Sequence, residues 1–376
     1  MNNKRMAFIV TAIVVVLLVG THVFLLQMTS PDKIVNVFVK AVEKNQPELL
    51  NEIVIADSKE AEVSKESLTA LTGYLQKNHN SYQVAKESLT TQIERKDFGT
   101  TNSQISLTTD GKKWGIYPVY KLKVKTGNVK VSGQNEDDEI QIQFKTLDHP
   151  VNRQEEGTFG PVVPGIHDVV VTIKNALGTV LEERQIEVWG TNDISVIVDP
   201  NKLIMEDEKT QKEILVALDT FNHDYSKFTT SEFTLSSFSN ISEEIDAEQL
   251  FVENEFALIK EYIDEIQSQY LGAIVNLDEL EINYFNGNWS AEIAALVSYK
   301  EKIKFRDYEK FDDASFKAIR NYTLTYDAAK KTWLITGFTD TTAQGSEADN
   351  WKNKQDISIQ DPPLLKWNRT SEETNL

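Results

Sequence analysis

The segment from Met6 to Met28 limits the possible folds more than any other part of this chain. It contains no Asp, Glu, Lys or Arg. As an α-helix at roughly 1.5 Å per residue it would extend about 34 Å, which is enough to cross the hydrocarbon core of a bilayer. Lys4 and Arg5 precede it, and basic residues mark the cytoplasmic flank of a spanning helix. We therefore predict a cytoplasmic N-terminus at residues 1–5, a single-pass anchor at 6–28 and an extracellular remainder.

A cleaved signal peptide is the alternative interpretation of this segment. Lys4 and Arg5 followed by an apolar run are also typical of a secretory signal. However, the run continues through residues 21–26, and no small-x-small cleavage site follows it. The pattern favours an uncleaved signal-anchor and a cell-membrane location with extracytoplasmic domains.

The rest of the chain is strongly acidic and contains no cysteine. With 58 acidic and 39 basic residues, the net charge of -19 argues against a nucleic-acid partner, which would require clustered Lys and Arg. The lack of cysteine excludes thiol catalysis, disulfide bonds and cysteine-ligated zinc or iron–sulfur sites. We expect no cofactor and no metal site.

The spacing of apolar residues changes twice along the extracellular part. Helical spacing begins after Ser30-Pro31, a cap followed by proline at the first helical position, and gives way to period two near Gly99. After residue 200, two helices at 203–228 and 247–270 are predicted to precede a run of strands. The predicted parts are a helical juxtamembrane module at 29–98, an antiparallel β-sandwich at 99–200, an α+β domain at 201–340 and a disordered tail at 341–376. The predicted fold class is multidomain α+β.

Two sequence segments, together with the order of the predicted domains, are similar to those of a known protein family. They are KKWGIYPVYKLKVKT, from Lys112 to Thr126, and GPVVPGIHDV, from Gly160 to Val169. Together with the anchor and the terminal α+β domain, they resemble the TcaA/YvbJ family of Gram-positive membrane proteins over residues 7–340. The resemblance implies a role in the cell envelope and in the response to glycopeptide antibiotics such as teicoplanin. It also implies that the terminal domain is nuclear transport factor two-like, with a curved sheet wrapped over helices as a cone.

One feature of the family is missing. Many relatives begin with a cytoplasmic zinc ribbon, whereas this chain has five residues before Met6 and no cysteine. The resemblance therefore implies no zinc-dependent cytosolic role for this chain.

The first candidate site is a lysine-rich run with neighbouring aromatic residues and no acidic residue. Its members are Lys112, Lys113, Trp114, Tyr117, Tyr120, Lys121, Lys123, Lys125 and Lys130. Because side chains alternate along a strand, Lys121, Lys123 and Lys125 are expected to share one face. Such a strip is suited to anionic wall polymer. A solvated lysine face that protects a sheet edge is the alternative interpretation.

The second candidate site consists of aromatic residues in the terminal domain. Cone-shaped folds often enclose a pocket, and concave apolar sites are where small ligands bind. The pocket candidates are Trp289, Tyr299, Phe305, Tyr322, Tyr326 and Trp333. The alternative is that these side chains are ordinary core.

No catalytic motif appears in the sequence. The five histidines lie outside the contexts that mark nucleophilic or zinc-dependent hydrolases, and we expect His79, His149, His167 and His223 in turns or on polar faces. Acidic clusters occur at 136–139, at 243–246 and at 312–313. Paired carboxylates are the catalytic groups of glycosidases, but solvated loops account for such clusters in an acidic chain.

The sequence therefore predicts a non-enzymatic envelope protein involved in cell-wall homeostasis or the response to wall-active antibiotics. Its expected partners are the membrane and an anionic wall polymer, a peptidoglycan precursor or a membrane protein. Two alternatives stay open: an extracellular wall-glycan hydrolase that uses Asp or Glu, and a sensory or assembly subunit of a membrane complex.

Overall fold

The structure is a computed structural model, and it describes residues 8, 11–17, 19–22, 29–99, 101–147, 150–151, 153–155, 157–190, 193–245 and 252–369. The predicted cytoplasmic residues 1–5 and much of the predicted span, including 23–28, lie outside these ranges. The described part of the predicted span is helical, with exposed apolar side chains. Within the described ranges, no helix combines the length and the apolar character needed to cross a membrane.

The described residues form two compact units. The first takes its residues from 1–134, 139–173 and 181–198. The second takes its residues from 135–138, 174–180 and 199–376.

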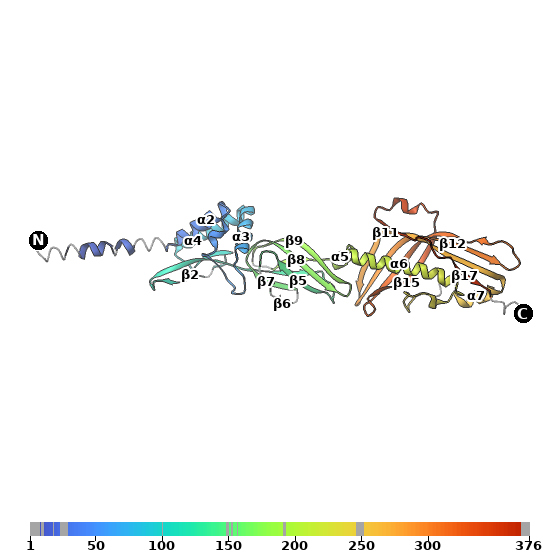
Figure 1. Cartoon of the computed structure of the whole chain (residues 1–376). Helices are drawn as coiled ribbons and strands as arrows, with labels where there is room; N and C mark the ends of the chain where they lie inside the picture. The colour runs from blue at the N-terminus through green and yellow to red at the C-terminus, as the bar shows by residue number, and fades with distance from the viewer. Residues whose placement is uncertain are drawn as a thin grey trace. The chain divides into compact units, whose positions relative to one another are not determined.

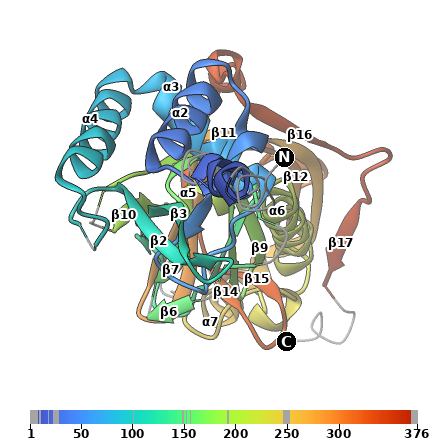
Figure 2. The same ribbon diagram turned by 90° about the vertical axis from the view of Figure 1, so that its left-hand side faces the viewer.

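The first unit begins with three helices and a short 3₁₀ turn (Figures 1 and 2). Their bounds are α2 Pro31–Glu43, η1 Pro47–Leu50, α3 Lys65–Lys77 and α4 His79–Arg95. The Ser30 hydroxyl caps α2 by accepting a hydrogen bond from the Lys33 amide, and Ser64 and Ser67 form a reciprocal capping box on α3. These caps satisfy backbone N–H groups that a helix leaves without partners in its first turn.

A small sheet packs against these helices. Its strands are β1 Val54–Ala56, β2 Ile105–Lys113 and β3 Tyr117–Val124, in the order β1-β3-β2 with β1 parallel to β3. Phe38, Leu68 and Leu89 of the helices share one hydrophobic core with Leu107 and Leu122 of the strands. The predicted boundary between residues 98 and 99 is therefore wrong, because the helices and the first hairpin bury their apolar faces against each other.

Two further sheets complete the first unit. One has the order β10-β4-β7-β6 and the other β5-β8-β9. The bounds are β4 Gly127–Ser132, β5 Glu139–Phe144, β6 Arg153–Glu155, β7 Thr158–Val162, β8 Gly165–Asn175, β9 Gly178–Val188 and β10 Ile194–Ile197. The predicted period-two burial is clear in β5 and β8. The prediction of a wholly antiparallel arrangement is wrong in one place, because β10 pairs with β4 in parallel.

The glycine of the GPVVPGIHDV segment has a packing role. A Cβ atom at Gly165 would lie 2.5 Å from the main-chain carbonyl carbon of Ala70 in α3. The start of β8 therefore approaches α3 more closely than any residue with a side chain would allow.

The second unit is a large curved sheet with one long helix across it (Figure 1). Its helices are α5 Pro200–Met205, α6 Glu208–Thr229 and α7 Glu253–Ile259. Its strands are β11 Ile263–Phe285, β12 Asn288–Phe305, β13 Asp312–Asp313, β14 Phe316–Asp327, β15 Thr332–Thr342, β16 Lys354–Ser358 and β17 Leu365–Asn368. The sheet order is β15-β14-β12-β11-β16, with β13 paired to β12 and β17 to β11. Buried residues of α6, such as Phe221, belong to the same core as the aromatic residues of β12, β14 and β15.

Two predictions for this unit are wrong. A helix was expected at 247–270, but α7 ends at Ile259 and strand β11 begins at Ile263. A disordered tail was expected from 341, but β16 and β17 both pair with β11, and Trp367 is buried. The described tail through 369 is therefore part of the domain, because it supplies hydrogen-bond partners to the edge of β11.

Candidate functional site

The lysine-rich run lies on and around strand β3. Leu122 and Val124 are fully buried, whereas Lys121, Lys123 and Lys125 are partly exposed. The alternation of a strand therefore sets these three lysines on the side opposite the core, as predicted. We call Lys121, Lys123 and Lys125 the lysine face.

The residues opposite Lys121 and Lys123 across the sheet are uncharged. Lys121 lies opposite Thr108, and Lys123 lies opposite Ser106 on β2 and Ile55 on β1. The Lys121 ammonium group donates a hydrogen bond to the main-chain carbonyl of Glu52. The neighbouring carboxylate of Asp57 accepts from the Thr126 amide and hydroxyl, at 2.9 Å and 2.8 Å.

The residues opposite Lys121 and Lys123 distinguish them from the lysines of β12. In the part of the chain that the structure describes, none of the lysine-face residues forms an ion pair. On β12, Lys300, Lys302 and Lys304 alternate in the same way, but Lys302 lies opposite Asp313 and Lys304 opposite Glu265. Lys121 and Lys123 are the more open to an external anion, because no carboxylate lies opposite them across the sheet. The Asp57 carboxylate lies near Lys125 and is already hydrogen-bonded to Thr126.

The other members of the run lie elsewhere. The Tyr120 ring packs against the Phe98 ring, with the ring centroids 4.8 Å apart. Lys130 is an exposed residue of β4, which belongs to a different sheet. Lys112, Lys113 and Trp114 lie at the turn between β2 and β3. The predicted strip is therefore divided into a lysine face on β3 and a separate hairpin tip.

Most of the predicted pocket residues of the second unit are core. Trp289, Tyr299, Tyr322 and Trp333 are each at most 3 % exposed, Tyr326 is partly buried, and Phe305 is 36 % exposed. Trp333 and Lys331 border a surface hollow of about 300 Å³ beside α6, together with Lys209, Lys212, Glu213, Val216 and Thr332. Apart from Trp333, none of the predicted pocket residues lines this hollow.

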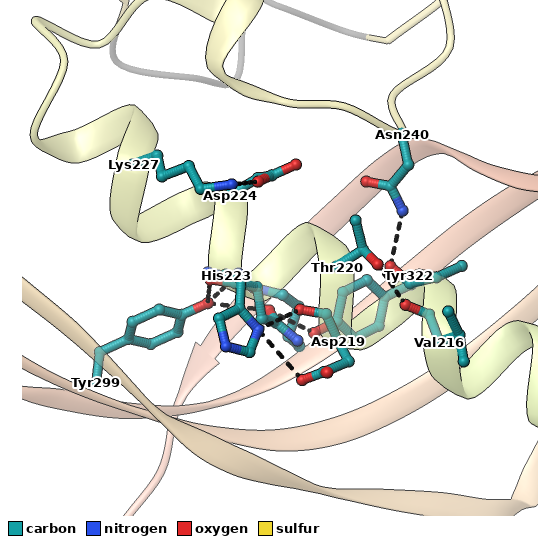
Figure 3. Close-up of polar contacts among 12 residues, drawn as sticks. Val216, Asp219, Thr220, His223, Asp224, Lys227, Asn240, Tyr299 and Tyr322 are labelled. Carbon is teal, nitrogen blue, oxygen red and sulfur yellow. Dashed lines mark hydrogen bonds and ion pairs between the residues drawn. The ribbon is translucent and has the colours of Figure 1, made fainter. Parts of the chain in front are cut away.

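Tyr299 and Tyr322 instead belong to a buried polar network that the sequence did not reveal. Their hydroxyls donate to Asn222 Oδ1 on α6, at 3.0 Å and 2.9 Å, and Figure 3 shows both tyrosines reaching toward this helix. Burial raises the pKa of Tyr322 to about 12 and also raises the pKa of Tyr299 well above its ordinary value, so both hydroxyls stay protonated donors at neutral pH.

Arg320 of β14 is the centre of this network. It is fully buried, and its Nε and Nη2 atoms each donate to the Asp340 carboxylate at 2.7 Å, while Nη1 donates to Asn222 Oδ1 at 3.1 Å. The guanidinium also stacks 4.4 Å from the Tyr225 ring and 4.5 Å from the Phe338 ring. A cation with this many partners fixes α6 to the sheet, because an unpaired buried charge is very costly.

One feature of the sequence indicated that Arg320 is unusual. Along β14 the buried positions alternate as Ala318, Arg320, Tyr322 and Leu324, so a charged residue stands in an apolar series. Period-two analysis alone assigns such a residue to neither face. Its partners Asn222 and Asp340 lie far away in sequence on α6 and β15.

The described histidines show no catalytic arrangement. His167 is fully buried on β8, which corrects its expected place on a polar surface, and His223 lies on α6 with its Nδ1 3.4 Å from Asp219 Oδ1 (Figure 3). His149 lies outside the described residues. Asp312 and Asp313 form the exposed strand β13. Among the described residues, no group of three His, Asp or Glu side chains could hold a metal ion.

Comparison with known families gives two matches. Residues 214–339, from α6 to β15, match the YvbJ NTF2-like domain, and residues 31–124, from α2 to β3, match the TcaA protein second domain. The second match ends with β3, in agreement with the shared core of the helices and the first hairpin. No curated protein and no solved structure matches the chain.

The fold and these matches define a mixed α+β protein that carries an NTF2-like domain. More particularly, the two matched domains are TcaA/YvbJ-like, as the sequence resemblance predicted. Such family domains are consistent with a protein associated with the cell envelope.

Proposed function

We propose that this chain is a non-enzymatic, single-pass protein of the Gram-positive cell envelope, with a cytoplasmic N-terminus and both folded units outside the cell. Its role is in cell-wall homeostasis or in the response to glycopeptide antibiotics. The support is its TcaA/YvbJ-like domains together with the charge-free segment from Met6 to Met28, which follows Lys4 and Arg5.

The lysine face is the proposed contact with the wall, and its ligand is an anionic polymer with phosphate groups. The observation that carries this proposal is the uncharged surroundings of Lys121 and Lys123 in a chain of net charge -19. Exposed charges more than about 10 Å apart are screened at about 0.1 M salt, so the local cluster and not the net charge governs binding. Phosphate oxygens accept strong hydrogen bonds from ammonium groups.

The test replaces Lys121, Lys123 and Lys125 together by Gln. The purified full chain in lipid nanodiscs is mixed with cell walls that carry or lack teichoic acid, and the bound fraction is measured by sedimentation. We expect a several-fold loss of binding to the teichoic-acid-bearing walls. Added salt should remove the same excess from the wild type, because a surface ion pair is screened.

The control replaces Lys300, Lys302 and Lys304 by Gln. This variant has the same charge change on a strand with the same alternation, but two of its lysines lie opposite carboxylates. It should retain wall binding. Equal binding by the lysine-face variant and the wild type at low salt, with both folded, would refute the proposed wall contact.

The same mixtures test the absence of enzymatic activity. Labelled peptidoglycan incubated with the full chain should release no soluble fragments. Soluble fragments released by the purified wild type would favour the wall-glycan hydrolase instead.

A further inference from the structure

The turn between β2 and β3 exposes large apolar side chains. Trp114 is 61 % exposed and Ile116 is 69 % exposed, although both lie in a hairpin whose strands are well paired. The backbone of Trp114 has φ +51°, between Gly111 and Gly115, which also have positive φ. A bulky aromatic residue seldom adopts this conformation, and such strain is concentrated at functional positions.

Two lysines accompany these apolar residues. Lys112 and Lys113 are exposed, and the Lys113 ammonium nitrogen lies 4.8 Å from the centre of the Trp114 ring. Asp110 is the one acidic residue in the 105–117 segment, and it too is exposed. We call residues 112–116 the hairpin tip. Tryptophan, an aliphatic residue and lysines in one small exposed group are typical of surfaces that enter the lipid–water interface.

The base of the hairpin tip contacts the charge-free N-terminal segment. The Tyr117 hydroxyl lies 2.6 Å from His22 Nδ1, and the two ring centroids are 5.5 Å apart. His22 is a residue of the predicted span, which ends at Met28. This contact sets the base of the hairpin tip beside a residue of the predicted span.

We propose that the hairpin tip is a second membrane contact, which inserts Trp114 and Ile116 into the outer lipid surface beside the anchor. Lys112 and Lys113 then bind the phosphate groups of anionic lipids. This inference rests on the proposed membrane anchoring. Its consequence is that the first unit is held against the bilayer at two points, which fixes its orientation, whereas a single span would leave it free to rotate.

Single-cysteine labelling tests the proposal, because the chain has no cysteine of its own. Ile116→Cys in the full chain is labelled with an environment-sensitive fluorophore and reconstituted in vesicles of phosphatidylglycerol and phosphatidylcholine. We expect a blue-shifted emission and several-fold stronger quenching by nitroxide-labelled lipid than by aqueous iodide. Leu181→Cys is the matched control, since Leu181 is also apolar and 60 % exposed in the first unit, and its label should show the reverse.

A third label separates the two ways of failing. Val15→Cys lies in the charge-free segment. If its label is inserted in lipid while the label at position 116 behaves like the one at position 181, the hairpin-tip contact is refuted and anchoring stands. If the label at position 15 is quenched by iodide, anchoring itself is refuted, and the inference with it.

The lysines are tested in the same vesicles. Lys112→Gln with Lys113→Gln should reduce lipid quenching of the label at position 116 several-fold in phosphatidylglycerol vesicles, and should leave the label at position 15 unchanged. Vesicles of phosphatidylcholine alone should give the same reduction with the wild-type lysines. Binding of the tip to wall polymer or to a second copy of the chain would instead shift the label only when walls or excess protein are added, and would refute the proposal.

Discussion

At the scale of single residues, His167 shows how burial sets a charge state. Its ring is fully buried, with Nε2 2.8 Å from the Val163 carbonyl oxygen and Nδ1 2.8 Å from the Thr146 hydroxyl. A neutral ring that donates from Nε2 and accepts at Nδ1 satisfies both partners. Burial lowers the pKa of His167 below its ordinary value of 6.5, so the folded state holds this ring neutral.

This lowered pKa predicts that the first unit loses stability in acid. The unfolded chain binds a proton at His167 more readily than the folded chain, so the stabilising contribution is present at neutral pH and is lost as pH falls below about 6.5. His167→Gln should lower the melting temperature of the first unit at about pH 7.5, and the gap to wild type should narrow at about pH 5.5. Scanning calorimetry at the two pH values measures this.

The control for this prediction is His79→Gln. His79 is exposed on α4 in the same unit, so its replacement should leave the melting temperature close to that of the wild type. A gap for His167→Gln that stays constant from neutral to acid conditions would show that the ring is not neutral in the folded state.

At the scale of elements, strand β17 closes a part of the sheet that the sequence did not assign to it. Trp367 of β17 packs edge-on against Phe256 of α7, with the ring centroids 5.2 Å apart, and against Ile263 and Ile266 of β11. The Trp367 Nε1 atom donates to a Glu232 carboxylate oxygen at 3.2 Å. Trp367 of the tail thus completes a small hydrophobic cluster formed with α7 and β11.

Trp367→Ala should therefore destabilise the second unit by about 3–5 kcal/mol, the usual cost of a large-to-small change at a buried tryptophan. Leu364→Ala is the control, because Leu364 is 48 % exposed and its loss should cost at most about 0.5 kcal/mol. Urea denaturation of the full chain, followed through the second unit, measures both. Equal effects of the two changes would contradict the packing of Trp367 and would support the predicted disordered tail.

These elements also show how far the sequence could predict the structure. Strands were predicted correctly where small groups of apolar residues alternate, as in β5 and β8. The segment at 263–270 was misassigned because Tyr262 and Ile266 also fit a helical spacing, while the buried positions of the strand include the polar Ser268. The tail was missed because its strands are short and polar and depend on β11, which precedes them by many residues.

For the lysine face, strand alternation predicted the burial pattern, in which Leu122 and Val124 are buried and Lys121, Lys123 and Lys125 are partly exposed. That this face is a binding site stays a prediction. Alternation gave no account of Arg320, whose burial depends on a bidentate partner on a neighbouring strand and an amide on α6. Exposure of the hairpin tip also depends on turn geometry, which two glycines only suggest.

At the scale of the whole molecule, the predicted topology puts both folded units on one side of the membrane. Protease added to intact, wall-stripped cells should therefore remove an epitope tag placed after residue 376, while a cytosolic marker protein stays whole. The physical reason is that Lys4 and Arg5 retain the N-terminus on the cytoplasmic side. Protection of the tag until the cells are lysed would contradict this orientation.

Under the proposed topology both units are exported, and the strand pairings then determine when each unit can finish folding. β10 pairs in parallel with β4, although the two strands are about 65 residues apart in sequence, and about 100 residues separate β17 from its partner β11. Both units therefore depend on long-range contacts, which form slowly. Until Leu365–Asn368 has left the translocation channel, part of β11 has an open hydrogen-bonding edge. An open edge is a template for pairing with other chains. The interval between the emergence of β11 and that of β17 is consequently the stage of export at which newly made copies are most prone to aggregate.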